Sequence, residues 1–213
     1  MSTAPCIALC VLLMFQYGSS VLLEKNCGRF KNIILNTPWL VSIRAGEKPE
    51  VICVGTLINE RFVLTAASCI HNQSSLKVRL GEIVENNNTK YAKYKYVEML
   101  VLRAIKHKLY SPGSDQNNIG LLRLPKDVVY MDHIQPICIE LNTDKSSRHK
   151  RSDWEWLPKT SVGYPKVQIV NDTVYFQTGI LSRDNVITAV REYAEDWILP
   201  TALEVDVIQY PLS

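Results

Sequence analysis

The chain contains six cysteines, and whether their thiols form disulfides depends on the compartment in which the chain folds. Cys6 and Cys10 lie in an apolar run over residues 6–15, which is followed by small residues before a possible cut after Ser20. This pattern is typical of a secretory signal peptide, although its first residues include no Lys or Arg. In an oxidising compartment the remaining four thiols predict two disulfides, with three possible connectivities. These four cysteines are Cys27, Cys53, Cys69 and Cys138.

Three asparagines lie in the pattern Asn-x-Ser/Thr, the acceptor sequence for N-linked glycosylation. They are Asn72, Asn87 and Asn171, each in polar, turn-like surroundings. Glycosylation at these positions fits a secretory route. The alternative, that they are unused surface tripeptides, stays open on the sequence alone.

Composition and charge exclude two classes of partner. Hydrophobic residues make up 46% of the chain and charged residues 21%, which is enough apolar material for a buried core. The net charge of +3 is small and dispersed, without the basic stripe that nucleic-acid binding needs. No apolar run is long enough to cross a bilayer. We therefore expect no nucleic-acid partner and no membrane span.

The stretch from residue 51 to residue 69 has the most regular pattern in the chain. Two apolar, β-branched runs, residues 51–58 and 62–64, flank the polar sequence Asn-Glu-Arg, which is typical of two strands joined by a tight turn. Cys53 lies in the first run and Cys69 follows the second. A bridge between them would close a loop of about 15 residues and contribute roughly 3 kcal/mol on the chain-entropy model.

Further stretches alternate apolar and polar residues, as half-buried antiparallel strands require. These predicted strands are residues 38–43, 75–80, 95–105 and 167–170. In the first of them, alternation places Trp39, Val41 and Ile43 on one face. Near the C-terminus, apolar residues at helical spacing predict a helix over residues 191–199, which we expect Pro200 to end.

Four stretches of the sequence resemble the trypsin/chymotrypsin family of serine proteases. Residues 64–69, Leu-Thr-Ala-Ala-Ser-Cys, resemble the family's Leu-Thr-Ala-Ala-His-Cys, and residues 117–124, Asn-Asn-Ile-Gly-Leu-Leu-Arg-Leu, resemble its Asn-Asp-Ile-Ala-Leu-Leu-Arg-Leu. Residues 175–182 resemble the strand that lines the family's substrate cleft, and residues 186–190 resemble its last strand. The resemblance implies an all-β, chymotrypsin-like double β-barrel with a short C-terminal α-helix.

The family's catalytic residues are changed at the matching positions. The histidine that acts as general base is replaced by Ser68, and the aspartate that orients it by Asn118. A serine hydroxyl cannot accept the proton, and the Asp to Asn change alone lowers turnover by about 10⁴ in an otherwise intact triad. His71 lies in a polar loop and is expected at the surface, while His107 matches a structural family histidine.

The family's nucleophile motif, Gly-Asp-Ser-Gly-Gly-Pro, is missing. The nearest stretch is residues 159–165, Lys-Thr-Ser-Val-Gly-Tyr-Pro, in which Ser161 is either a relic of the nucleophile or an ordinary turn serine. The Ile-Val-Gly-Gly sequence that activates family zymogens is also missing near Cys27. The resemblance therefore implies an inactive homologue, and we expect neither a metal nor a cofactor.

The resemblance selects one disulfide connectivity, namely Cys53 with Cys69 and Cys27 with Cys138. It also implies the domain organisation: a signal peptide over residues 1–20, an N-terminal segment over 21–37 and a peptidase-like domain over 38–213. Residues 38–141 form the first barrel in this scheme and residues 142–213 an incomplete second barrel with the helix. We expect the second barrel to be truncated because residues 139–174 contain one convincing strand and a polar connector with the basic run Arg148 to Arg151. That run is either a convertase site or a solvated loop.

The sequence therefore predicts a secreted, extracellular trypsin-like homologue without proteolytic activity. Its expected role is that of a binding partner or regulator in an extracellular proteolytic cascade, where proteases or their substrates would be its partners. Two alternatives stay open: an active serine endopeptidase with an unorthodox triad, and a shortened isoform without function.

Overall fold

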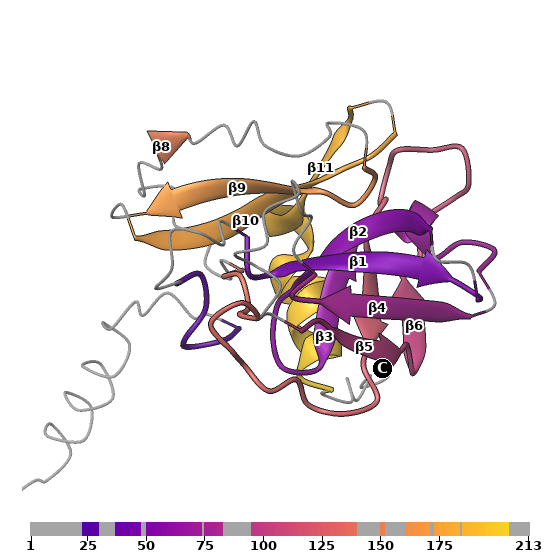
Figure 1. Ribbon diagram of the computed structural model, residues 1–213. Coiled ribbons are helices and arrows are strands. Elements are labelled where there is room, and N and C mark those ends of the chain that lie inside the picture. The colour runs from indigo at the N-terminus through magenta and orange to yellow at the C-terminus, as the bar shows by residue number, and fades with distance from the viewer. Residues whose placement is uncertain are drawn as a thin grey trace, which may run out of the picture.

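The computed structural model is an all-β chain with a short helical stretch at its C-terminal end (Figure 1). The residues that it describes are 23–29, 37–47, 50–73, 75–82, 95–139, 150–151, 161–170, 173–183 and 185–204. The predicted signal peptide, Asn87, Asn171 and Arg148 lie outside these residues. Within them, the chain folds into two antiparallel sheets, and the all-β prediction is confirmed.

The larger sheet has seven strands in the order β5-β4-β1-β2-β3-β7-β6. They are β1 (Leu40–Ala45), β2 (Val51–Leu57), β3 (Phe62–Thr65), β4 (Leu76–Leu80), β5 (Val97–Leu100), β6 (Arg103–Lys106) and β7 (Gly120–Arg123). The two outermost strands, β5 and β6, follow one another in the chain and are separated by Val101 and Leu102. The sheet therefore curls until its two ends meet, as in one barrel of a chymotrypsin-like fold.

The prediction of one strand over residues 95–105 is wrong, because two strands occupy this range. β5 pairs with β4, whereas β6 pairs with β7 at the other end of the sheet. Between them, the N–H of Val101 donates to the carbonyl of Leu76 and the N–H of Leu102 to that of Arg123. The chain thus changes pairing partner at this point.

The smaller sheet has four strands in the order β11-β10-β9-β8. They are β8 (Lys150–Arg151), β9 (Pro165–Val170), β10 (Val174–Leu181) and β11 (Ile187–Ala189). Among the residues that the structure describes, no pairing joins β8 to β11, so this sheet stays open. Within the described residues, the second barrel of the predicted fold is thus an open sheet of four strands.

The C-terminal helical stretch is continuous from residue 190 to residue 202. It consists of a 3₁₀ turn, η3 (Val190–Tyr193), a π-helical turn, η4 (Ala194–Ile198), and an α-helical turn, α2 (Leu199–Ala202). The prediction that Pro200 ends the helix is wrong. Pro200 lies in the first turn of α2, directly after the π-helical turn η4, and the helical stretch continues through it to Ala202. No described helix has the length and apolar character that a membrane crossing requires.

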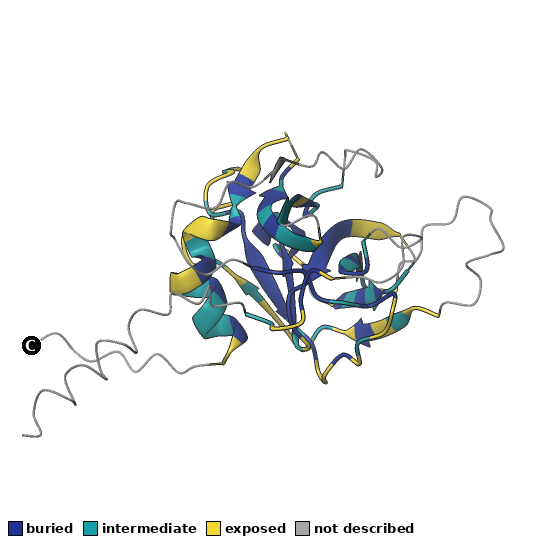
Figure 2. Ribbon diagram, turned by 90° about the vertical axis from the view of Figure 1, so that its left-hand side faces the viewer, coloured by how far each residue is buried: buried dark blue, intermediate teal, exposed yellow. Residues whose placement is uncertain are grey.

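The core is built by the inward faces of the strands. Trp39, Val41 and Ile43, which alternation places on one face, are no more than 1% exposed. Figure 2 shows buried residues in the central strands, whereas the helical stretch has both buried and exposed sides. Ala194 and Ile198 on its inner side are buried against the same core.

The two sheets are joined by contacts between distant parts of the sequence. The buried Thr56 in β2 donates its hydroxyl hydrogen to the side-chain oxygen of the buried Gln177 in β10. The disulfide between Cys27 and Cys138 attaches the N-terminal segment, and the N–H of Cys138 donates to the carbonyl of Tyr175 in β10. These contacts fix the smaller sheet against the larger one.

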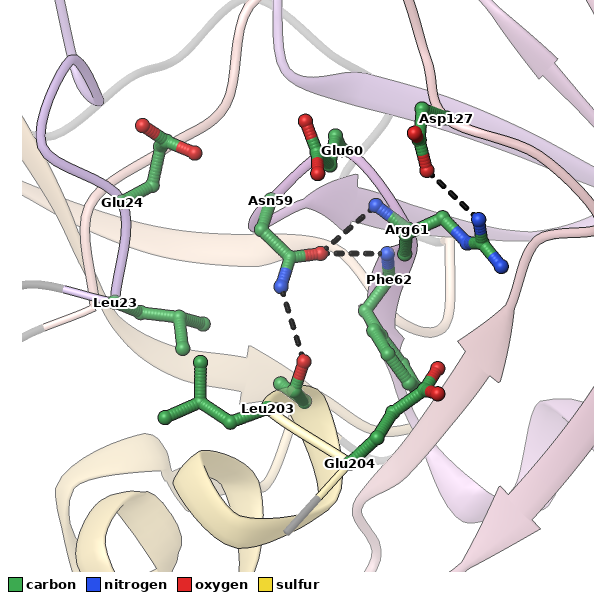
Figure 3. Close-up of a pocket in the computed structure, with 10 residues that line it drawn as sticks. Leu23, Glu24, Asn59, Glu60, Arg61, Phe62, Asp127, Leu203 and Glu204 are labelled. Carbon is green, nitrogen blue, oxygen red and sulfur yellow. Dashed lines mark hydrogen bonds and ion pairs between the residues drawn. The ribbon is translucent and has the colours of Figure 1, made fainter.

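Asn59 connects the turn between β2 and β3 with the end of α2 (Figure 3). Its Oδ1 accepts the backbone N–H groups of Arg61 and Phe62 at 2.9 and 2.8 Å, while its Nδ2 donates to the carbonyl of Ala202 at 3.4 Å. A hollow of about 450 Å³ lies beside it, and Leu23 of the N-terminal segment is one of the residues that line it. One amide therefore stabilises the turn and holds the helix end.

Candidate active site

The hairpin of β2 and β3 positions the first candidate residue, Ser68. β3 leads into a 3₁₀ turn, η1 (Ala67–Cys69), in which the N–H of Cys69 donates to the carbonyl of Ala66 at 3.1 Å. A disulfide joins Cys69 to Cys53 in β2, with 5.9 Å between their Cα atoms. Both disulfides in the structure are the pairings that the resemblance implies. The turn that holds Ser68 is thus fixed to the sheet on both sides.

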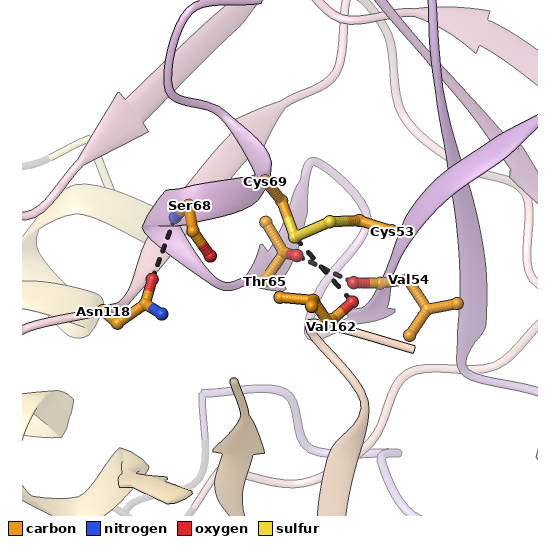
Figure 4. The surroundings of a disulfide bond; sticks show 7 residues. All are labelled: Cys53, Val54, Thr65, Ser68, Cys69, Asn118 and Val162. Atoms are coloured by element: carbon orange, nitrogen blue, oxygen red, sulfur yellow. Dashed lines mark hydrogen bonds between the residues drawn. A yellow bond between two sulfur atoms is a disulfide. The ribbon is translucent and has the colours of Figure 1, made fainter. Parts of the chain in front are cut away.

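Asn118 meets Ser68 from a segment 50 residues further along the chain (Figure 4). Its Oδ1 accepts the backbone N–H of Ser68 at 2.9 Å, and the residue is 4% exposed. The segment before it is held by two further bonds: Ser182 donates its hydroxyl hydrogen to Asp115 at 2.8 Å, and Tyr193 donates to Asn117 at 3.1 Å. The structure therefore brings together the two positions at which the family places its base and the group that orients it.

The hydroxyl of Ser68 is buried and has no hydrogen-bond partner among the described residues. A general base must form a hydrogen bond to the group from which it takes a proton. Ser68 forms no such bond here, and Asn118 contacts the backbone of Ser68 rather than its hydroxyl. The pair therefore has a structural role in this arrangement, because it ties η1 to the segment before β7.

Ser161, the third candidate, lies in a turn that packs against the same disulfide. The residue of that turn nearest to the disulfide is Val162, whose carbonyl accepts the N–H of Val54 at 3.0 Å and lies 3.8 Å from the sulfur of Cys69. In the described part of the chain, no hydrogen bond joins the hydroxyl of Ser161 to Ser68 or Asn118. The structure thus brings the turn to the site but does not connect its serine to the other two candidates.

Gly163 explains how this turn approaches so closely. Its φ is +90°, and a Cβ atom at this position would lie 2.0 Å from the carbonyl oxygen of Val54 and 2.7 Å from Oγ1 of Thr65. Only glycine fits such a contact without displacement of the backbone. The sequence analysis did not single out Gly163, although the Val-Gly-Tyr-Pro turn contains the signal.

Comparison with known proteins decides the family. A family model described as Trypsin matches residues 27–189. The chain belongs to the trypsin family.

The inactive CLIP domain-containing serine protease A28 of Anopheles gambiae is 36% identical over 113 residues, which cover 51% of this chain and 30% of that protein. The Spaetzle-processing enzyme of Drosophila melanogaster is 32% identical over 124 residues, which cover 48% of this chain and 31% of that protein. The clotting factor G beta subunit of Tachypleus tridentatus is 34% identical over 134 residues, which cover 54% of this chain and 40% of that protein. The chain thus spans about a third of the length of the curated relatives that it matches.

Two histidines of this trypsin-family chain, His71 and His107, make contacts away from Ser68. His71 is partly exposed, and its Nδ1 lies 3.2 Å from Nζ of Lys106. The ring of His107 packs edge-on against Tyr193 and Trp197, with centroid separations of 5.1 and 5.4 Å. Burial lowers the pKa of His107, and the charge of Lys108 lowers it further. In the described residues, neither imidazole forms a hydrogen bond with Ser68.

An electrostatic cluster that the sequence analysis missed stabilises the edge of the first barrel. The carboxylate of Glu82 accepts hydrogen bonds from Ser42, Arg44 and Arg79, with Arg44 Nη2 at 2.8 Å and Arg79 Nη1 at 3.1 Å. Burial opposes ionisation of Glu82, but these bonds outweigh it, so the pKa of Glu82 lies below its ordinary value. Arg44 is only 7% exposed, so this carboxylate compensates the cost of burying its charge.

Two other predicted features, the glycosylation sites and the basic run, lie only partly within the described residues. Asn72 is exposed in the turn after η1, with a φ of 60°. Of the basic run, Lys150 and Arg151 form β8, and the residues before them lie outside the described part. Among the residues described, no group of three or more His, Cys, Asp or Glu side chains is placed to hold a metal ion.

Proposed function

We propose that this trypsin-family chain is a secreted protein without peptidase activity that binds proteins of an extracellular proteolytic cascade. The hydrogen bond between the N–H of Ser68 and Oδ1 of Asn118 carries the proposal, because it brings together the two residues that match the family's base and orienting positions by motif. Neither a neutral hydroxyl nor a neutral amide accepts a proton from a serine near neutral pH. The proposed partners are proteases of the cascade or their substrates.

The relatives support an extracellular setting by their printed names. They include a clotting factor subunit, a Spaetzle-processing enzyme and an inactive CLIP domain-containing serine protease. The two disulfides support the same setting, since such bonds persist in oxidising compartments. We therefore propose that residues 1–20 are a signal peptide and that Asn72 carries a glycan, with Asn87 and Asn171 as further acceptor sites.

The proposed division of the chain follows the sequence analysis. Residues 21–37 form an N-terminal segment, and residues 38–213 form the peptidase-like domain. The seven-stranded sheet from Leu40 to Arg123 supports a first barrel within residues 38–141. The four-stranded sheet and helical turns support an incomplete second barrel within residues 142–213.

A fluorophosphonate probe tests the loss of catalysis, since it labels only a serine whose nucleophilicity is raised by a base. We expect no labelling of the disulfide-bonded chain above that of the same chain after heat denaturation. Labelling of the folded chain that disappears in Ser161→Ala would overturn the proposal and restore the interpretation of Ser161 as a nucleophile.

Quantitative capture of proteins from extracellular fluid tests the proposed binding role. The folded chain is immobilised beside the same chain reduced and alkylated, which keeps the composition but loses both disulfides. We expect one or more cascade proteases or their substrates to be enriched on the folded chain alone. Equal recovery on both forms would contradict a specific binding role.

A further inference from the structure

A hollow of about 370 Å³ lies between the C-terminal helical stretch and the residues that follow β6. We name it the C-terminal pocket. Its lining residues are His107, Lys108, Glu192, Tyr193, Asp196 and Trp197. None of them is one of the three candidate catalytic residues Ser68, Asn118 and Ser161, although Tyr193 holds the segment before Asn118 through its bond to Asn117.

Aromatic rings form one wall of the C-terminal pocket. Tyr193 and Trp197 lie four residues apart in the helical stretch, are partly exposed, and both meet the ring of His107 edge-on. The hydroxyl of Tyr193 donates to Oδ1 of Asn117, which fixes this ring in place. Because burial lowers the pKa of His107, its imidazole is neutral at neutral pH and adds no positive charge to this wall.

The rim of the C-terminal pocket carries more negative than positive charge. Glu192 and Asp196, also four residues apart, are exposed, and no described residue forms an ion pair with either. Lys108 supplies one positive charge, so the rim sums to −2 + 1 = −1. In the part of the chain that the structure describes, the cation–π contact is that of Arg79 with Tyr96, so the rings of the pocket hold no cation of the chain itself.

We propose that the C-terminal pocket binds a lysine or arginine side chain of a partner protein. Aromatic rings attract a cation through their quadrupoles, and carboxylates beside them add charge complementarity. An acidic partner would meet Glu192 and Asp196 with like charge, and an uncharged one would leave both carboxylates without a counter-ion. The inference rests on the binding half of the proposed function and adds the chemistry by which a partner is recognised.

Nuclear magnetic resonance on the intact disulfide-bonded chain tests the proposal with Nα-acetyl-lysine methylamide as probe. The indole N–H signal of Trp197 is assigned by its loss in Trp197→Phe. We expect a saturable shift of this signal at concentrations up to tens of millimolar, the range of a single weak contact. The matched probe, in which the side-chain amine is acetylated, keeps the stem but not the charge and is expected to cause no saturable shift.

Three variants of exposed residues separate the pocket from the general charge of the helix. Asp196→Asn should weaken binding about threefold, the size of one exposed charge contact. Lys108→Gln should strengthen binding, since it removes the positive charge from the rim. Glu195→Gln, which removes an exposed carboxylate of the same stretch outside the pocket, should leave binding unchanged.

Any one of three results would overturn the inference. These are an equal response to both probes, the absence of a saturable shift, and equal effects of Asp196→Asn and Glu195→Gln. Such a failure leaves the proposed function standing, because capture and labelling do not depend on this pocket. Conversely, peptidase activity would remove the proposed function and leave a positive titration of the pocket valid.

Discussion

Replacement of Ser68 by alanine should make the protein more stable, although the residue itself is only partly buried. The hydroxyl of Ser68 is buried without a partner among the described residues. A buried polar group without a hydrogen bond costs roughly 1 to 3 kcal/mol, and the methyl group of alanine removes this cost while leaving little empty volume. We therefore expect Ser68→Ala to raise the free energy of unfolding by about 1 kcal/mol.

Thr65→Val is the matched control for this prediction. Thr65 is a fully buried hydroxyl three residues earlier, but its Oγ1 donates to the carbonyl of Val54 at 2.7 Å. Valine has almost the same shape, so the substitution removes the hydrogen bond and should lower stability by about 1 kcal/mol. Two neighbouring hydroxyls are therefore expected to change stability in opposite directions.

Urea unfolding of the oxidised protein, followed by tryptophan fluorescence and by circular dichroism, measures both changes. In thermal unfolding, about 1 kcal/mol corresponds to a shift of roughly 2 to 4 °C for a protein of this size. A clear loss of stability in Ser68→Ala would refute the reasoning. It would mean that the hydroxyl at the base position has a hydrogen-bond partner and that the site is more organised than the structure indicates.

Three further predictions concern other parts of the protein. Glu82→Gln should lower the free energy of unfolding by about 2 kcal/mol, because it leaves the buried Arg44 without its carboxylate. Since the pKa of Glu82 in the folded state lies below its ordinary value of 4.5, its contribution is present above pH 4.5 and is lost as the pH falls through the lowered pKa. The acid limb of the stability profile should therefore be flatter in the variant, and an unchanged limb would contradict the assigned pKa. Gly163→Ala should destabilise the fold by about 3 kcal/mol in urea unfolding, as its Cβ would meet the carbonyl of Val54, and a neutral result would show that the turn can move. Asn72→Gln should remove one glycan from the secreted protein, seen as a mass decrease that glycosidase treatment abolishes, and an unchanged mass would exclude this site.

Strands and hairpins formed by neighbouring residues could be predicted from sequence, because their apolar and polar patterns lie within short stretches. The two apolar, β-branched runs, residues 51–58 and 62–64, flank a polar turn and predict the hairpin of β2 and β3. The prediction failed over residues 95–105, where an alternating pattern predicts one strand but the pairing partner changes after β5. Alternation reports which face a side chain takes and contains no information about which strand lies beside it.

Only the candidate-site residues that lie within the family motifs could be predicted from sequence. The motifs identify Ser68 and Asn118, whose contact spans 50 residues. They do not show that the carbonyl of Val162, rather than the hydroxyl of Ser161, meets β2, because that contact is made by the backbone of two segments. The bond between Thr56 and Gln177, across 121 residues, is equally invisible in the sequence, since either polar residue fits an ordinary strand.

The claim that positions 68 and 118 provide no general base is tested most directly by peptide-bond hydrolysis. The assay incubates the purified, disulfide-bonded chain with a mixture of peptide substrates across the pH range in which a histidine base would work, with and without a fluorophosphonate. We expect no cleavage above buffer at any pH. Cleavage that increases with protein concentration and stops with the fluorophosphonate would contradict this claim.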